Sequence, residues 1–280
     1  MPTDRIRVTQ KEGILSYDPP HFNGMVGARL PGIEAMVGSV VNKHNIQEDF
    51  EFYVRIADDP WSEEMPDNYY GFCVYDNKYE KAFPDYMYVG QPETGLDSYT
   101  RTITTYVDTV PQFNKVGWVG SLSCGEKTNR PLFKRMAEQS EHLEFIDVTL
   151  NTWVEDAHKL NTQFMSYQDQ VDRWKYLIDL EGCGWSGRLK LLMASPRITF
   201  IADRPYSEWW FQHIEPWKHY VPVKRDLSDL IENYHIIEGD MELQNTIKKN
   251  AKELIDVCLT RESAENRIYQ ILQHVIKNPL

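Results

Sequence analysis

The sequence feature that most constrains the fold is a regular alternation of strand-like and helix-like segments in the second half of the chain. From about residue 114 onward, short β-branched or aromatic runs are followed by loops and then by helical runs. Repeated strand–loop–helix units predict a parallel sheet with helices on both of its faces. We therefore expect an α/β fold, in which ligands bind outside the carboxyl ends of the strands.

The expected elements become more regular along the chain. Strands are predicted in the second half at residues 116–121, 143–150, 174–180, 197–202 and 219–223. Helices are predicted at residues 130–139, 186–194, 207–213, 226–234, 241–258 and 263–277. The first third has strand-like runs at residues 50–56 and 70–75 and is otherwise expected to be irregular. We infer a lobe at residues 1–113, a second lobe at 114–262, and a terminal helix at 263–280 that packs back on the first lobe.

Length, charge and cysteine spacing exclude several classes of protein. With 280 residues the chain exceeds a typical single domain, and its net charge of −12 opposes binding to nucleic acid or anionic lipid. The four cysteines form no C-x-x-C pair, which argues against a zinc ribbon or a disulfide scaffold. No apolar run reaches the ~18 residues of a membrane span, and the first residues show no signal-peptide pattern, so we expect a cytoplasmic location.

The segment at residues 175–195, KYLIDLEGCGWSGRLKLLMAS, carries the clearest chemical signal. A strand is expected to end at Leu180, and Ser186 stands where a helix begins. The free N–H groups and the dipole of that first turn suit a phosphate or diphosphate, to which Arg188 and Lys190 can add charge. Such a turn is equally typical of a plain helix cap with solvated basic residues.

Five blocks in this region resemble the family 90 glycosyltransferases, which include fungal capsule-associated xylosyltransferases and animal protein O-glucosyltransferases. The matching blocks, in order, are KYLIDLEG at 175–182, WSGRLK at 185–190, YSEWW at 206–210, EPWKHYVPV at 215–223 and DLSDL at 226–230. The resemblance implies a GT-B fold, with two Rossmann-like lobes and a cleft between them. It also implies an inverting transfer from UDP-glucose or UDP-xylose, with Ser186 and Arg188 binding the diphosphate. The short chain is similar to the compact members of large algal DNA viruses, in which case the location would be the host cytoplasm.

The resemblance extends weakly into the first half. The strand at 50–56, followed by Asp58-Asp59-Pro60, is similar to a family strand that ends in Arg-Asp-aromatic-Pro. That aspartate is the family's proposed catalytic base, and it falls on Asp58, with Asp59 as the alternative because Ala57 and Asp59 depart from the pattern. A turn-forming Asp-Asp-Pro without catalytic function is the structural alternative.

Further donor-site residues are implied by the same resemblance. The run Trp118-Val119-Gly120-Ser121 is similar to an aromatic-Arg-Gly-Ser segment, with Val119 in place of the arginine. Glu208 is placed like the acid that holds the ribose hydroxyls in many GT-B enzymes, and its alternative role is a helix-dipole contact. The implied UDP-sugar site consists of Gly120, Ser121, Arg130, Trp185, Ser186, Gly187, Arg188 and Glu208.

No metal site is expected. Asp179 and Glu181 form an Asp-x-Glu pair at a strand end, which we interpret as structural. The expected activity is transfer of a sugar, with xylose favoured because Val119 and Trp185 indicate a crowded pocket, from a UDP-sugar to a glycan hydroxyl. The first lobe would lie on the acceptor side and the second would bind the donor. The alternatives are a UDP-glucose-dependent glucosyltransferase and a sugar-nucleotide or glycan-binding module without turnover.

Overall fold

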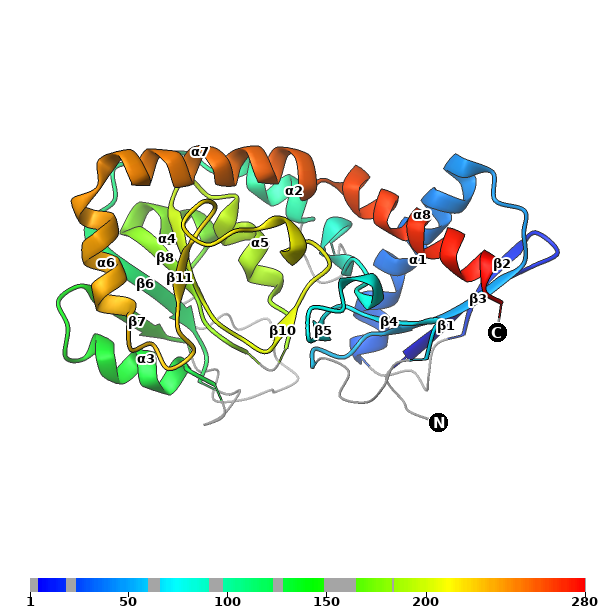
Figure 1. Ribbon diagram of the computed structural model, residues 1–280, viewed down its shortest axis with the longest axis horizontal. Coiled ribbons are helices and arrows are strands. Elements are labelled where there is room, and N and C mark those ends of the chain that lie inside the picture. Colours follow the sequence, from blue (N-terminus) through cyan, green and yellow to red (C-terminus); the bar gives the residue numbers. More distant parts are fainter. Residues whose placement is uncertain are drawn as a thin grey trace. The chain divides into compact units, whose positions relative to one another are not determined.

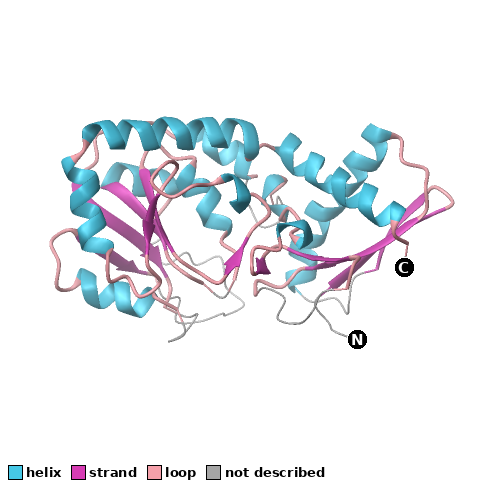
Figure 2. Cartoon of the chain, viewed as in Figure 1, coloured by secondary structure: helices cyan, strands magenta, loops and turns pink. Residues whose placement is uncertain are grey.

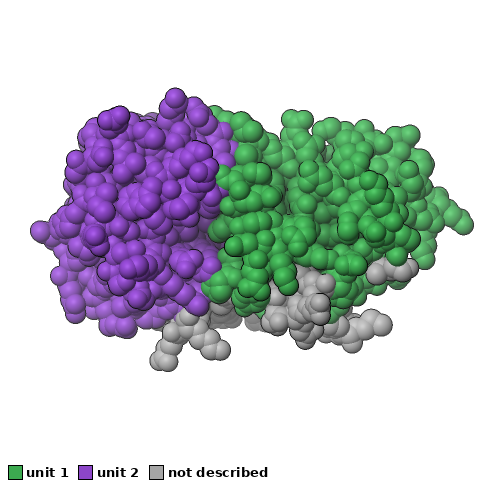
Figure 3. Space-filling model, in the orientation of Figure 1, with its two compact units in different colours: residues 1–104, 205–213, 256–280 green, residues 105–204, 214–255 purple. Residues whose placement is uncertain are grey.

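The chain forms two compact units in the computed structural model, which describes residues 5–18, 24–59, 66–90, 98–122, 128–148, 165–182 and 184–279. Unit 1 consists of Met1–Thr104, Pro205–His213 and Asp256–Leu280, and unit 2 of Thr105–Arg204 and Ile214–Ile255 (Figure 3). Each unit is therefore assembled from segments that are distant in the sequence.

Unit 2 is built on a parallel sheet of five strands, with the order β11-β9-β8-β6-β7 (Figure 1). The strands are β6 (Phe113–Gly120), β7 (Leu143–Asp147), β8 (Trp174–Asp179), β9 (Ile198–Ala202) and β11 (Val221–Val223). The central strands β8 and β9 are almost wholly buried, as expected for a parallel sheet that is covered on both faces. The predicted α/β fold is confirmed for this unit.

Helices pack on both faces of this sheet (Figure 2). They are α3 (Arg130–Ala137), α4 (Tyr167–Arg173), α5 (Gly187–Met193), α6 (Leu230–Gly239) and α7 (Met241–Cys258). Tyr176 packs with Phe133 of α3 and Tyr234 of α6, whereas the next residue, Leu177, packs with Leu192 of α5. Because successive side chains of a strand point to opposite faces, these clusters are the two hydrophobic layers of the unit.

The sheet of unit 1 has four strands in the order β2-β1-β3-β4. They are β1 (Arg5–Lys11), β2 (Ile14–Asp18), β3 (Phe50–Arg55) and β4 (Tyr69–Gly71). Strand β1 is antiparallel to β2 and β3, and only β3 and β4 are parallel. The expected Rossmann-like first lobe is therefore wrong for the described sheet. The reason is local: Glu12 and Gly13 both have positive φ, which closes β1 and β2 into a tight hairpin.

Two long helices cover this sheet, so the prediction of an irregular N-terminal third is also wrong. Helix α1 (Gly24–His44) buries Ile33, Met36, Val37 and Val40, which recur at helical spacing. Helix α8 (Arg261–Lys277) packs against α1 and β3. Helix α1 contains Pro31 and several glycines, which conceal it in the sequence. Within the described ranges, no helix is both long and apolar enough to cross a membrane.

Short elements complete unit 1. They include β5 (Val74–Tyr75), α2 (Tyr99–Thr102), β10 (Tyr206–Ser207) and the 3₁₀ turns Tyr79–Lys81, Tyr86–Tyr88, Ile103–Thr105 and Phe211–His213. Strand β10 pairs with β5, which places Tyr206 opposite Tyr75. The helix predicted at 207–213 is therefore wrong. A strand pair over a separation of about 130 residues leaves no local signal in the sequence.

Candidate functional site

Most of the predicted donor-site residues surround one cavity at the carboxyl end of β8. The cavity has a volume of about 180 Å³ and lies in unit 2, where the chain passes from β8 into α5. Its lining residues are Trp118, Arg130, Asp179, Leu180, Gly182, Gly184, Trp185, Ser186, Gly187 and Arg188. The cavity thus lies at the edge of a parallel sheet where ligands of α/β proteins bind.

Two arginines make this cavity cationic. Arg188 donates to the carbonyl oxygen of Val119 at 2.5 Å, and its guanidinium carbon lies 5.2 Å from the centroid of the Trp118 ring. Arg130 donates to the carbonyl oxygen of Ser121 at 3.0 Å and lies 5.1 Å from the same ring. Each guanidinium has five N–H donors, so both arginines can bind an anion while they keep these backbone contacts.

Ser186 begins α5 and is held by a buried ion pair. Its hydroxyl donates to Asp179 at 2.9 Å and accepts from the backbone N–H of Leu189 at 3.2 Å. Asp179 in turn accepts from Arg204 at 2.6 Å, and both of these side chains are at most 3% exposed. The structural interpretation of Asp179 therefore fits its contacts. The expected hydrogen bond from Ser186 to a diphosphate stays a prediction. To make it, the Ser186 hydroxyl must give up its hydrogen bond to Asp179.

Glycines allow the arginines and Trp118 to approach the backbone closely. A Cβ atom on Gly120 would lie 2.5 Å from the Trp118 ring, and one on Gly182 would lie 2.9 Å from Arg130. Neither separation is compatible with normal packing. Gly120 therefore needs glycine because the buried Trp118 ring occupies the space of a Cβ, whereas at Gly182 the contact is the end of the flexible Arg130 side chain, which can shift.

The cavity has an aromatic wall on the side of α5. Trp185 lines it, and the buried Lys190 lies 5.3 Å from the Trp185 ring centroid. Nearby, burial raises the pKa of Tyr167, and Arg188 opposes that rise. Tyr167 is therefore a neutral phenol at physiological pH, and the positive charge of the cavity is not offset by a phenolate.

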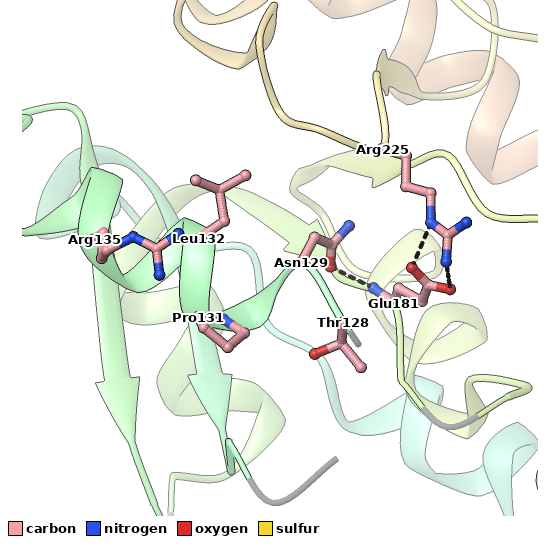
Figure 4. Close-up of a pocket in the computed structure, with 7 residues that line it drawn as sticks. All are labelled: Thr128, Asn129, Pro131, Leu132, Arg135, Glu181 and Arg225. Atoms are coloured by element: carbon pink, nitrogen blue, oxygen red, sulfur yellow. Dashed lines mark hydrogen bonds and ion pairs between the residues drawn. The ribbon is translucent and has the colours of Figure 1, made fainter. Parts of the chain in front are cut away.

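A second cavity of about 480 Å³ lies at the same edge of the sheet (Figure 4). It is lined by Thr128, Asn129, Pro131, Leu132, Arg135, Glu181 and Arg225. Arg225 binds both oxygens of Glu181, at 2.7 and 2.9 Å, and Asn129 accepts from the backbone N–H of Glu181 at 2.9 Å. Both acids of the Asp-x-Glu pair are thus engaged with arginines.

The two candidate bases follow β3 in unit 1 and have different partners. Asp58 accepts from Arg29 of α1 at 2.5 Å, and its side chain is 46% exposed. Asp59 accepts from Arg55 at 2.8 Å and is 58% exposed. Pro60 lies outside the described residues. Arg29, which sequence reasoning missed, carries no recognisable motif on α1.

Glu208 lies in a different environment from the one expected. It belongs to unit 1, follows β10 instead of starting a helix, and is 2% exposed. Its carboxylate accepts from the indole N–H of Trp210 at 3.0 Å. The expected start-of-helix position in the second lobe is wrong because β10 pairs with β5. A contact between Glu208 and a ribose stays a prediction.

Three residues at the sheet edge of unit 2 were not predicted as site residues. Asn129 precedes α3, Arg204 follows β9, and Arg225 follows β11. The available signal was their position directly after strands or before a helix in the α/β part of the chain. Arg204 binds the carboxylate of Asp179, and Arg225 binds that of Glu181. Asn129 accepts from the backbone N–H of Glu181.

Comparison with known proteins shows which family the sequence matches. The family model described as Glycosyl transferase family 90 matches residues 22–278. The chain is 27% identical to protein O-glucosyltransferase 3 of Homo sapiens over 160 residues, which are 52% of this chain and 32% of that protein. It is 24% identical to protein O-glucosyltransferase 2 of Danio rerio over 225 residues, 74% of this chain and 43% of that protein. The matches thus span less than half the length of these relatives. Because the family model covers most of its residues, the chain belongs to glycosyl transferase family 90.

Proposed function

We propose that this chain is an inverting glycosyltransferase that transfers a sugar from a UDP-sugar to a hydroxyl group of a glycan. The observation that carries the proposal is the cavity in unit 2, where Arg130 and Arg188 both line the space beside the start of α5. Membership of family 90 supports the reaction class. The relatives' name, protein O-glucosyltransferase, supports transfer of a sugar to an oxygen atom. The name does not specify the donor.

The donor would bind through its diphosphate in this cavity. Arg188 and Arg130 would each contribute charge-assisted hydrogen bonds, and Trp118 fixes both guanidinium groups by stacking. As the sugar–phosphate bond breaks, negative charge develops on the leaving UDP. Fixed cations that stabilise this charge are typically a large catalytic term. Ser186, Gly187 and Trp185 would complete the donor site with Gly120 and Ser121.

Positive charge from arginines can replace a metal ion, so we propose that no metal is required. Activity should then persist after exhaustive dialysis against EDTA and should not rise when Mn²⁺ is added. The measurement is UDP release before and after dialysis. Loss of activity that Mn²⁺ alone restores would contradict this proposal. The metal would then need acidic ligands such as Asp179 and Glu181, which are paired with Arg204 and Arg225 in the structure.

The acceptor hydroxyl would be deprotonated by Asp58. An inverting transfer needs one carboxylate as general base, which typically contributes ~10²–10⁴ in rate. Asp58 is in unit 1 and the donor cavity is in unit 2. We propose a two-lobe enzyme of the GT-B type, in which the first lobe has a mainly antiparallel sheet in place of a Rossmann-like one.

Xylose remains the favoured sugar, with glucose as the second candidate. The crowding expected from Val119 is not supported, because its side chain packs in the hydrophobic cluster with Trp174, Leu177 and Leu192. Trp185 does line the cavity and now carries the argument for a smaller sugar alone. The names of the relatives favour glucose.

A single assay distinguishes these possibilities. The protein is incubated with UDP-xylose or UDP-glucose and a panel of glycans, and UDP release is measured with and without acceptor. We expect release that depends on the acceptor and is faster with UDP-xylose. Faster release with UDP-glucose would establish the second candidate. Tight UDP binding without any release would indicate a binding module and contradict the proposed enzyme.

A further inference from the structure

Arg29 has an unusually constrained place beside the candidate base. Its guanidinium donates to the carbonyl oxygen of Ile56 and to the carboxylate of Asp58, the latter at 2.5 Å. Its side chain is only 10% exposed, and its guanidinium carbon lies 5.5 Å from the Tyr86 ring centroid. The two acceptors are two residues apart, so one planar guanidinium bridges the turn that follows β3.

The helix that carries Arg29 is itself fixed at this point. A Cβ atom on Gly32, one turn further along α1, would lie 2.6 Å from Tyr86. Glycine at this position therefore lets α1 approach the 3₁₀ turn Tyr86–Tyr88 closely. The backbone of Asp58 is held as well, because the buried thiol of Cys73 donates to its carbonyl oxygen at 3.4 Å.

The neighbouring pair offers a direct contrast. Arg55 binds Asp59 at 2.8 Å from within the same strand and turn, and the Asp59 side chain is 58% exposed. Arg29 reaches Asp58 from a different element, across 29 positions in the sequence, and is nearly buried. Arg55 is itself only 15% exposed, so the two pairs differ in the origin of the arginine: Arg29 comes from a separate helix and also binds the carbonyl oxygen of Ile56, whereas Arg55 lies in the strand that leads into the turn.

We propose that Arg29 is a positioning residue that orients the Asp58 carboxylate toward the acceptor hydroxyl. This inference rests on the proposed function, because it assumes that Asp58 is the general base. The planar fork of an arginine fixes the direction of its partner, which a lysine ammonium does not. Proton transfer requires the base to lie within hydrogen-bond reach of the hydroxyl, so a small rotation of the carboxylate slows the reaction.

The test is Arg29→Gln, measured as kcat and KM for the UDP-sugar, with UDP affinity from calorimetry and folding from thermal unfolding. We expect kcat to fall by about 10²-fold, as for a misplaced catalytic group. The KM for the donor and the affinity for UDP should stay unchanged. Arg29→Lys keeps the charge but not the fork, and its kcat should be intermediate. The lysine variant also serves if the glutamine variant does not fold.

Arg55→Gln is the matched control, because it removes the ion pair of the neighbouring carboxylate, Asp59, in the same turn. It should leave kcat close to that of the unmodified protein. In an Asp58→Asn background, Arg29→Gln should cause no further loss, since two residues that act as one unit are not additive. If Asp58→Asn is inactive while folded Arg29→Gln and Arg29→Lys keep full kcat, the positioning role is wrong and the proposed function stands. If Asp58→Asn keeps full kcat, the base assignment in the proposed function fails first.

Discussion

Asp58→Asn is expected to abolish sugar transfer while the affinity for UDP remains nearly unchanged. Asparagine keeps the size of the side chain and can still accept a hydrogen bond from Arg29, but it cannot take a proton from the acceptor hydroxyl. The loss should therefore appear in turnover, by ~10²–10⁴-fold, and not in donor binding. Turnover from UDP release and affinity from calorimetry measure the two effects separately.

Asp59→Asn is the control for this prediction. Among the described residues Asp59 pairs with Arg55, four positions earlier, and it is more exposed than Asp58, so its replacement should leave turnover unchanged. An inactive Asp59→Asn beside an active Asp58→Asn would move the base by one residue and keep the mechanism. Full turnover in both variants would show that neither carboxylate is the base.

Arg188→Ala is expected to weaken UDP binding by about 10–150-fold, the equivalent of ~1.5–3 kcal/mol for a hydrogen bond to a charged group. Arg188 lines the cavity, stacks on Trp118 and is fixed by the carbonyl oxygen of Val119. Its guanidinium is therefore preorganised for an anion before the donor arrives. Arg188→Lys should recover only part of the affinity, because a lysine lacks the planar fork.

Lys134→Ala is a suitable control for charge alone. Lys134 is a partly exposed cation on α3, the helix that begins with Arg130, and it lines neither cavity. Its removal changes the net charge of the protein as Arg188→Ala does. UDP affinity measured by calorimetry should stay unchanged in Lys134→Ala. If the unmodified protein, Arg188→Ala and Lys134→Ala all bind UDP with equal affinity, the diphosphate does not bind in this cavity.

The elements of unit 2 were predictable because their signals are local. Strand β8 is a mostly apolar run that ends shortly before two glycines, and α5 begins after a serine that caps it. Ser186 and Arg188 both line the cavity at the start of this helix, and their binding of a diphosphate stays a prediction. The hydrogen bond from Ser186 to Asp179 depends on the approach of Arg204, which is not encoded in the local sequence.

Unit 1 was poorly predicted because its structure depends on contacts between distant segments. Helix α1 contains a proline and several glycines, which in a sequence predict the end of a helix. Its buried face is completed by α8, which is distant in the sequence. Strand β10 exists only through its pairing with β5. Arg29 illustrates the same limit for a site residue, because its importance arises from the meeting of α1 with the turn after β3.

The discontinuity of unit 1 has a consequence for how the protein is made. Strand β10 and helix α8 belong to unit 1 but are synthesised after most of unit 2. Until they leave the ribosome, β5 lacks β10, its partner among the described strands, and the side of α1 that packs on α8 is exposed. Unit 2 can therefore complete its parallel sheet during translation, whereas unit 1 must wait with exposed apolar surface, a state that favours aggregation. Cellular chaperones would thus be needed mainly for the part of unit 1 that is made before β10 and α8.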